Sequence, residues 1–148
     1  NRASQLTNKV NQFNFSTNRY DISKIQRLKK SKTGEIKLVS FKDKFGDHGI
    51  IGLYNLTYIN KNSILITDFL LSCRVINRKI EDYILYKILN NHKQKNVFIH
   101  FIENKNNKSL INLFLKKSFF ILEKKIGKKK LYKIKPNEVL LNAKNFFK

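Results

Sequence analysis

The amino-acid sequence predicts a mixed α/β domain in which a largely antiparallel central sheet is flanked by helices. Residues 62–71 are apolar and β-branched with Asp68 as the one acidic interruption, which is typical of a strand buried on both faces. From Val75 to Leu89 the apolar residues recur at three- and four-residue spacing, which indicates an amphipathic helix. Further apolar runs of strand length lie before and after this unit.

The N-terminal part predicts a helix followed by a hairpin. Residues 1–20 form an amide-rich opening segment without glycine or proline, which suits either a surface loop or the wall of a binding pocket. Asp21 can cap a helix that begins at Ile22 and ends before Gly34. Two alternating strands and the Asp- and Gly-rich turn between them come next, at 35–41, 50–59 and 43–49.

The C-terminal part predicts a strand, a helix and a second hairpin. Residues 96–102 are a short apolar run, and 104–117 contain a helical pattern. A hairpin turning at Gly127 is expected from two alternating segments, 118–123 and 130–134. Pro136 ends this pattern before an apolar tail, 138–147, which suits either strand or helix.

Length and composition indicate one domain, residues 1–148, with enough apolar content (41%) for a single core. The chain has no methionine, so we expect it to be part of a longer protein. One cysteine excludes an internal disulfide framework, and no apolar run reaches the ~18 residues of a membrane span. Without a secretory signal pattern, the predicted location is cytoplasmic.

The formal charge of +21 raises the question of nucleic-acid binding. The charge comes from 26 Lys against 5 Arg, beside 19 Asn and 18 Ile, a mixture typical of an AT-rich genome. Sequence-specific binders rely on Arg for bidentate contacts with bases, and no RNA-binding signature or zinc-finger spacing is present. We therefore favour solvated background charge over a nucleic-acid surface.

The predicted order of elements is the one used by the GCN5-related N-acetyltransferase fold. Three blocks make the resemblance more specific: RASQLTNKVNQFNFSTNRY, KDKFGDHGIIG and DFLLSCRVINRKIE. They resemble, in order, the C-terminal region of FkbH-like proteins. In that family a phosphatase-type domain of the haloacid dehalogenase superfamily precedes an acetyltransferase-like domain.

The resemblance implies acyl transfer to or from the thiol of an acyl carrier protein, as in polyketide or surface-polysaccharide biosynthesis. Well-known members of the family pass a three-carbon glyceryl unit from a phosphorylated glycerate to the carrier. The implied partners are an acidic carrier protein, which the basic surface would attract, and the protein's own N-terminal phosphatase domain.

The resemblance also places a coenzyme A loop at the start of the long helix. Acetyltransferases of this fold hold the pyrophosphate on backbone amides of a Gly-containing loop, and here Asn77 and Lys79 replace glycines while Glu81 adds a carboxylate. The residues aligned with cofactor binding are Asn77, Arg78, Lys79 and Asn107. We expect no tightly bound cofactor, only weakly bound coenzyme A or the phosphopantetheine arm of a carrier.

The predicted catalytic residues are centred on Cys73, a thiol flanked by Arg74 at the end of the buried strand. Arg74 and a helix N-terminus would favour an anionic sulfur able to carry an acyl group, although a buried, inert cysteine is the alternative. Asp68 needs a partner such as Arg74 or Lys9. His48 could serve as a base or be a solvent-facing turn residue.

The predicted substrate pocket combines the amide-rich segment, the Asp- and Gly-rich turn and the strand end. Lys9 would contact an oxyanion or phosphate together with Arg74, and Asp43 and Asp47 could instead be simple turn caps. The pocket residues are Asn8, Lys9, Asn11, Gln12, Asn14, Asp43, Gly46, Asp47, Gly49 and Ser72.

Three other functions remain open at this point. One is a non-catalytic module that docks carrier proteins, and another is an ordinary acetyl-coenzyme A-dependent N-acetyltransferase; a nucleic-acid-binding domain is less favoured. At the position where the family has a tyrosine as general acid, the chain has Phe114. The three histidines lack metal-ligand spacing, so no metal is predicted.

Overall fold

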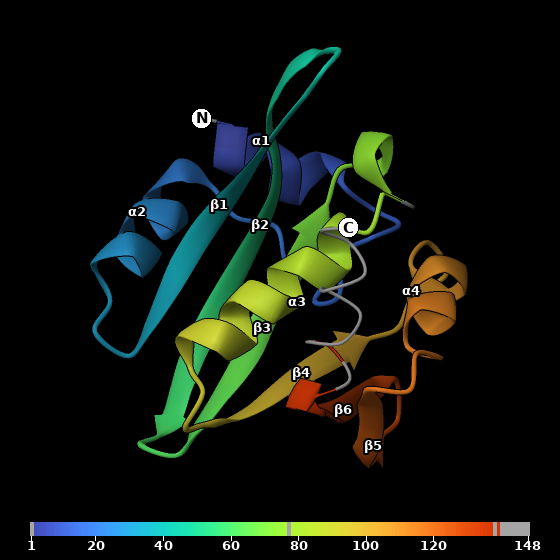
Figure 1. Ribbon diagram of the computed structural model, residues 1–148. Coiled ribbons are helices and arrows are strands. Elements are labelled where there is room, and N and C mark those ends of the chain that lie inside the picture. The colour runs from blue at the N-terminus through green and yellow to red at the C-terminus, as the bar shows by residue number, and fades with distance from the viewer. Residues whose placement is uncertain (1, 77, 138, 140–148) are drawn as a thin grey trace.

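Figure 1 shows a computed structural model of the chain, which describes residues 2–76, 78–137 and 139. The elements with defined bounds are four α-helices, one short 3₁₀ turn and six strands, and Pro136, Asn137 and Val139 are also helical. In chain order they are α1 (Arg2–Lys9), α2 (Ile22–Lys30), β1 (Gly34–Asp43), β2 (Gly46–Asn60), β3 (Ser63–Leu71), the 3₁₀ turn η1 (Cys73–Val75), α3 (Ile80–Asn91), β4 (Asn96–Ile102), α4 (Lys108–Phe114), β5 (Phe120–Ile126) and β6 (Lys129–Ile134).

The six strands form one sheet in the order β1-β2-β3-β4-β6-β5. Neighbouring strands are antiparallel except β3 and β4, which run parallel and pair Ser63–Ile66 with Asn96–Ile99. A parallel pair needs a crossover, and α3 supplies it. The mixed, largely antiparallel sheet flanked by helices that the sequence predicts is therefore confirmed.

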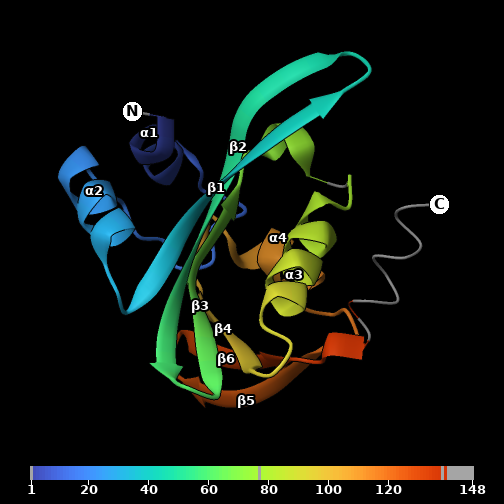
Figure 2. The same cartoon turned by 60° about the vertical axis from the view of Figure 1, so that its left-hand side comes forward.

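Helices cover the sheet on both faces. Figure 2 shows α1 and α2 on one side and α3 and α4 on the other, while the β1–β2 hairpin extends beyond the neighbouring strands. A small core joins α1 and α2 to the sheet through Ala3, Leu6, Val10, Ile25, Leu53 and Leu70. The larger core lies under α3 and includes Ile64, Ile66, Phe69, Ile84, Leu85, Ile88, Val97 and Ile99.

The residues between α1 and α2 are inserted between β3 and β4 where these strands diverge. Phe15 N–H donates to Phe69 O (3.0 Å), and Leu71 N–H donates to Phe13 O (3.0 Å). Ile102 N–H donates to Phe15 O at 2.8 Å, so the segment bridges both strands. The open edges of the two strands need hydrogen-bond partners, and the backbone of this segment supplies them. The side chains of Phe13 and Phe15 are fully buried there. A surface-loop interpretation of residues 1–20 is therefore wrong, and α1 was not predicted.

Two other boundaries differ from the predictions. The turn expected over 43–49 is shorter, because β2 already begins at Gly46. The helix expected from Val75 begins at Ile80 instead, because Val75 belongs to the 3₁₀ turn and enters the core from there. Asp21 caps α2 by accepting from Lys24 N–H at 2.8 Å, and Gly127 turns the β5–β6 hairpin with φ 59°. Of the apolar tail, residues 138 and 140–147 lie outside the described residues.

Candidate functional site

One large cavity, which we call the Cys73 cavity, has a volume of about 720 Å³ and brings together three segments distant in sequence. The end of α1 and the loop after it contribute Lys9, Asn11 and Gln12, and η1 contributes Cys73. The region of α4 contributes Lys105, Asn106, Ser109, Leu110 and Leu113. The predicted convergence of the amide-rich segment with the end of β3 is thus present in the structure.

Cys73 is exposed in this cavity rather than packed in the core. Its thiol donates to Gln12 Oε1 at 3.8 Å, so its hydrogen-bond partner among the described residues is an amide and not an imidazole or a carboxylate. The expected helix N-terminus is not adjacent, because α3 begins only at Ile80. An accessible thiol can exchange with another thiol or a thioester, but help in activating it must come from nearby charge.

The charge nearest this thiol in the cavity wall is positive. Lys9 and Lys105 are the charged residues among the described wall residues, so the cavity suits a phosphate or a developing oxyanion. Arg74 follows Cys73 directly, but its side chain does not line the described wall of the cavity. Its Nε donates to Ser72 Oγ, just after the end of β3, at 3.3 Å. Ser72 also caps η1, so its hydroxyl helps to shape the turn that presents the thiol.

Asp68 lies inside β3 and is completely buried, outside the wall of the Cys73 cavity. Arg74 and Lys9, its expected partners, do not bind it. The carboxylate instead accepts hydrogen bonds from four neutral side chains, Ser16, Asn18, Tyr20 and Asn55. Burial, and next the charge of Asp68, raise the pKa of Tyr20 well above its ordinary value. This arrangement makes Asp68 an anchor for the loop between α1 and α2.

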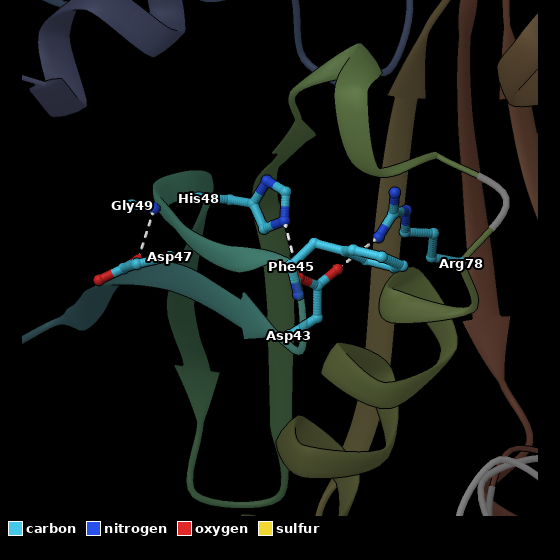
Figure 3. A network of polar contacts seen from close by, with 6 residues as sticks. All are labelled: Asp43, Phe45, Asp47, His48, Gly49 and Arg78. Carbon is cyan, nitrogen blue, oxygen red and sulfur yellow. Dashed lines mark hydrogen bonds and ion pairs between the residues drawn. The ribbon is translucent and has the colours of Figure 1, made fainter.

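Asp43 and His48 meet at the tip of the β1–β2 hairpin (Figure 3). The Asp43 carboxylate accepts from Phe45 N–H at 2.9 Å and from Arg78 Nη1 at 2.9 Å, and it contacts His48 Nε2 at 3.2 Å. Desolvation raises the pKa of Asp43, but the hydrogen bonds from Phe45, His48 and Arg78 outweigh it and lower this pKa below the ordinary value. Arg78 thereby links the hairpin to the segment that precedes α3.

The other predicted turn residues shape this tip. Asp47 accepts from Gly49 N–H at 2.8 Å, and Gly46 and Gly49 have φ of 136° and 70°. None of them lines the Cys73 cavity as far as it is described, and His48 packs on Phe41 with ring centroids 5.1 Å apart. The predicted pocket therefore does not include this turn, and Asp68, which pairs with Asn55 inside the sheet, lies far from the tip.

Three of the predicted amides serve the backbone. Asn8 Nδ2 donates to Ser4 O at 2.8 Å, and Asn14 Nδ2 donates to Val10 O at 3.2 Å. Asn107, fully buried, donates to both Asn14 O and Ile102 O at 2.9 Å. The Asn107 bonds hold the inserted segment against the end of β4, while the Asn8 bond lies within α1 and the Asn14 bond within the segment after it. None of the three residues lines the described wall of the Cys73 cavity.

The start of α3 is where the pyrophosphate of coenzyme A would bind. Lys79 has a left-handed backbone (φ 62°), as a glycine would, and gives no side-chain cap. The first turn then carries two buried carboxylates, Glu81 and Asp82, at the helix end that would attract an anion. A pyrophosphate there would meet two like charges, so these residues do not fit the coenzyme A loop. Asn77 lies outside the described residues.

Sequence reasoning missed the contribution of the α4 region to the Cys73 cavity. Lys105, Asn106 and Ser109 line it, yet they precede or begin a helix that lies more than thirty residues from Cys73 in the chain. Their neighbour Asn107 was singled out, but it supports the backbone. Phe114 is buried in the core and brings no hydroxyl group to either side of α4.

In the described part of the chain no group of three or more His, Cys, Asp or Glu residues could hold a metal ion. Among the helices that the structure describes, none is both long and apolar enough to cross a membrane.

The fold has clear counterparts among solved structures, although no family model matches the chain and no curated protein matches its sequence. A mutant of spermidine N-acetyltransferase SpeG from Vibrio cholerae superposes with a TM-score of 0.59 at 13% identity, covering 95% of this chain and 90% of that one. N-acetyltransferase PseH from Campylobacter jejuni gives a TM-score of 0.54 at 15% identity, covering 74% and 73%.

A third counterpart has a bound ligand. A GNAT-family acetyltransferase from Elizabethkingia anophelis with acetyl-CoA bound gives a TM-score of 0.54 at 17% identity, covering 78% of this chain and 83% of that one. At such low identity the likeness concerns the fold. The sheet and helices are therefore those of the GCN5-related N-acetyltransferase fold, as the order of elements predicted.

Proposed function

We propose that this chain transfers a small acyl group to or from the thiol of an acyl carrier protein, with Cys73 carrying the group as a thioester. The observation that supports the proposal is the exposed Cys73 thiol in a large cavity whose described charges are Lys9 and Lys105. A fold shared with acyl-transferring enzymes is consistent with it.

The exchange needs only groups of the chain and the carrier. The Cys73 sulfur attacks the carbonyl carbon of the carrier's thioester, forming a new carbon–sulfur bond, and the bond to the carrier sulfur breaks. The proton of the Cys73 thiol ends on the departing carrier thiol. Lys9 and Lys105 stabilise the oxyanion of the intermediate, and Gln12 orients the Cys73 S–H to which it is bonded.

The resemblance to FkbH-like proteins supplies the finer part of the proposal. It favours a three-carbon glyceryl unit, a phosphatase domain preceding this one in the same protein, and an acidic carrier. The net charge of +21 supports such a carrier, because long-range attraction raises the rate of encounter. Asn11 lines the cavity next to Gln12 and would contact the polar acyl group.

The proposal is tested by looking for a covalent acyl adduct on Cys73. Acyl-loaded carrier protein is mixed with the chain, and intact mass is measured with and without hydroxylamine. We expect one hydroxylamine-labile acyl adduct that Cys73→Ala abolishes and that Ser40→Ala, at an exposed serine of β1, retains. An adduct of equal yield on Cys73→Ala, or transfer that proceeds without any adduct, would contradict the proposal.

An ordinary acetyl-CoA-dependent N-acetyltransferase is the second candidate, favoured by the acetyl-CoA complex of one structural counterpart. The buried carboxylates of Glu81 and Asp82 count against it. We expect calorimetric titration to give an acetyl-CoA dissociation constant in the millimolar range, about −4 kcal/mol. Micromolar affinity would make this candidate the leading function.

A non-catalytic docking module is the third candidate, and it shares the carrier with the first. Carrier binding without an adduct at Cys73 would favour it. In either case binding should weaken as salt shortens the Debye length from about 30 Å to about 8 Å. Duplex nucleic acid that binds more tightly than the carrier at physiological salt, with sequence preference, would point instead to a nucleic-acid-binding domain.

A further inference from the structure

Part of the sheet has an apolar face that no described helix covers, on the side opposite α3. Figure 2 shows α1 and α2 beside β1 and β2, away from β4, β6 and β5. In β3, β4 and β6 the residues next to Leu65, Phe98 and Leu131 pack against the larger core, so strand alternation points these three side chains to the other face. None of the three belongs to either of the two cores.

Two neighbouring hollows lie on this face, and together we call them the open-face groove. Their volumes are about 270 and 230 Å³, and they share Leu65 and Leu131. The residues that line them come from adjacent strands, β2, β3, β4, β6 and β5, which at about 4.8 Å per spacing gives a length on the order of 19 Å. One hollow is lined by Ile59, Ser63, Leu65, Phe98 and Leu131, and the other by Leu65, His100, Lys124, Ile126, Lys129 and Leu131.

The open-face groove is apolar along most of its length and positively charged at one end. Lys124 of β5 and Lys129 of β6 lie at this end, and its described wall contains no carboxylate. The Nε2 of His100 donates to Thr67 O at 2.8 Å, and burial is the main cause that lowers the pKa of His100, so its ring is neutral at pH 7. The charge of the groove therefore comes from the two lysines.

Charge and shape select among the possible occupants. A second copy of the chain would bring like charges together, because each chain carries a net charge of +21 and each groove has two lysines. Ile59 and Ile126, at the two ends, are 54% and 64% exposed, whereas Leu65, Phe98 and Leu131 between them are half-buried. The middle of the groove is thus recessed, which suits a single narrow chain better than a flat bilayer surface.

We propose that the open-face groove binds a long-chain fatty acid, with its carboxylate between Lys124 and Lys129 and its alkyl chain lying over Leu131 and Leu65 toward Ile59. The apolar floor provides the contact area, and the two ammonium groups fix the direction of the chain. The groove shares no described wall residue with the Cys73 cavity. This binding therefore goes beyond the proposed acyl transfer, and either proposal can fail without the other.

The experiment titrates the ¹⁵N-labelled full chain with decanoate at pH 7, below the concentration at which it forms micelles. We expect saturable shifts of the amide signals of Leu65, Phe98 and Leu131. From octanoate to dodecanoate the affinity should rise about two- to fourfold per added methylene, because each one is buried. Decyltrimethylammonium, with a chain of the same length and a cationic head, should bind at least tenfold more weakly. No saturable shifts, shifts centred on the Cys73 cavity, or equal affinity for the cation would overturn the proposal.

Matched variants separate the groove from general attraction of anions to a basic protein. Lys124→Gln combined with Lys129→Gln should weaken decanoate binding at least tenfold. Lys29→Gln combined with Lys30→Gln removes the same net charge from α2 and should leave the affinity within about twofold. All four lysines are exposed, so we expect both double variants to fold. Equal weakening in the two double variants would refute the site.

A second pair of variants tests the path of the alkyl chain. Ile59→Ser removes apolar contact at the end far from the lysines, so it should weaken dodecanoate binding at least threefold and leave octanoate binding unchanged. Ile22→Ser, at an exposed isoleucine of α2, is the control and should change neither. Equal loss for both acids in Ile59→Ser would contradict the assigned path. Cosedimentation with anionic phospholipid vesicles, without binding of monomeric decanoate, would identify a membrane surface instead and overturn the proposal.

Discussion

The Tyr20 hydroxyl donates a 2.7 Å hydrogen bond to Asp68 Oδ2, joining the loop after α1 to the middle of β3. Ser16 and Asn18 of the same loop donate to the other carboxylate oxygen. A buried carboxylate without a cation is costly unless neutral donors satisfy it. These bonds therefore fix the loop whose earlier residue Gln12 contacts Cys73.

Removing the carboxylate should loosen this loop and lower stability. We expect Asp68→Ala to reduce the free energy of unfolding by about 3 kcal/mol, because several buried donors lose their acceptor at once. Urea unfolding measures this change. Asp47→Ala, at the hairpin tip, is the matched control and should change stability by less than about 1 kcal/mol. Equal losses in both variants would show that Asp68 is not the anchor.

Tyr20 should make the protein sensitive to alkaline pH. Its pKa is raised above the ordinary 10.0 in the folded state, by burial and then by Asp68. The protonated hydroxyl thus favours folding, so this contribution is complete below pH 10 and is lost as the pH rises beyond it. Urea unfolding between pH 8 and pH 11 should show the loss, and Tyr20→Phe should show less of it. A steeper decline in Tyr20→Phe would contradict the assignment.

The strands could be predicted from sequence because their burial follows local patterns. The boundaries Asn96–Ile102 of β4 agree with the apolar run that predicted them. The start of α3 could not be predicted in the same way. Val75 and Ile76 continue the helical spacing, but they reach the core from a 3₁₀ turn and the residue after it. The spacing of apolar residues predicts which side chains are buried, but it does not predict the backbone conformation at each of them.

The site was predictable only in part, for a related reason. Family blocks drew attention to Cys73 and Gln12, which the fold does bring together. The partners of Asp68 lie up to 52 residues away in sequence, and no local signal pairs a strand carboxylate with Ser16 or Tyr20. The Oε2 atom of Glu81, buried without a hydrogen-bond partner among the described residues, is likewise a product of packing between α3 and α4.

Lys79 occupies a backbone conformation that glycine adopts without strain. Its φ of 62° costs a residue with a Cβ about 1 kcal/mol. We expect Lys79→Gly to raise stability by up to about 1 kcal/mol, seen as a higher Tm. Lys87→Gly, inside α3, provides the opposite control and should lower stability by about 1 kcal/mol. A lower Tm for Lys79→Gly would mean that the Lys79 side chain contributes more than its strained backbone costs.

Arg78 should matter for the local order of the hairpin tip more than for global stability. Its bond to Asp43 is partly exposed, and exposed ion pairs contribute little to unfolding free energy. We expect Arg78→Ala to leave the urea midpoint nearly unchanged while speeding amide hydrogen exchange in residues 43–49. Arg27→Ala, on α2, is the control without this contact. Unchanged exchange at the tip in Arg78→Ala would show that the hairpin is ordered by its own turn.

Glu81 should destabilise the protein near neutral pH. Its pKa in the folded state is raised above the ordinary 4.5, mainly by burial. The stability that Glu81 contributes is therefore complete below pH 4.5 and is lost as the pH rises through the raised pKa. Replacing it with leucine removes a buried carboxylate oxygen that has no partner among the described residues.

We accordingly expect Glu81→Leu to be more stable than the unmodified chain by about 1–3 kcal/mol at pH 7. The difference should shrink at pH 4, where Glu81 takes up a proton. Comparing the two proteins at each pH cancels the titration of carboxylates that they share, including Asp82 in its ion pair with Lys117. Urea unfolding at both pH values measures the difference. A gap that grows toward pH 4, or a less stable Glu81→Leu at pH 7, would show that the carboxylate is satisfied in solution.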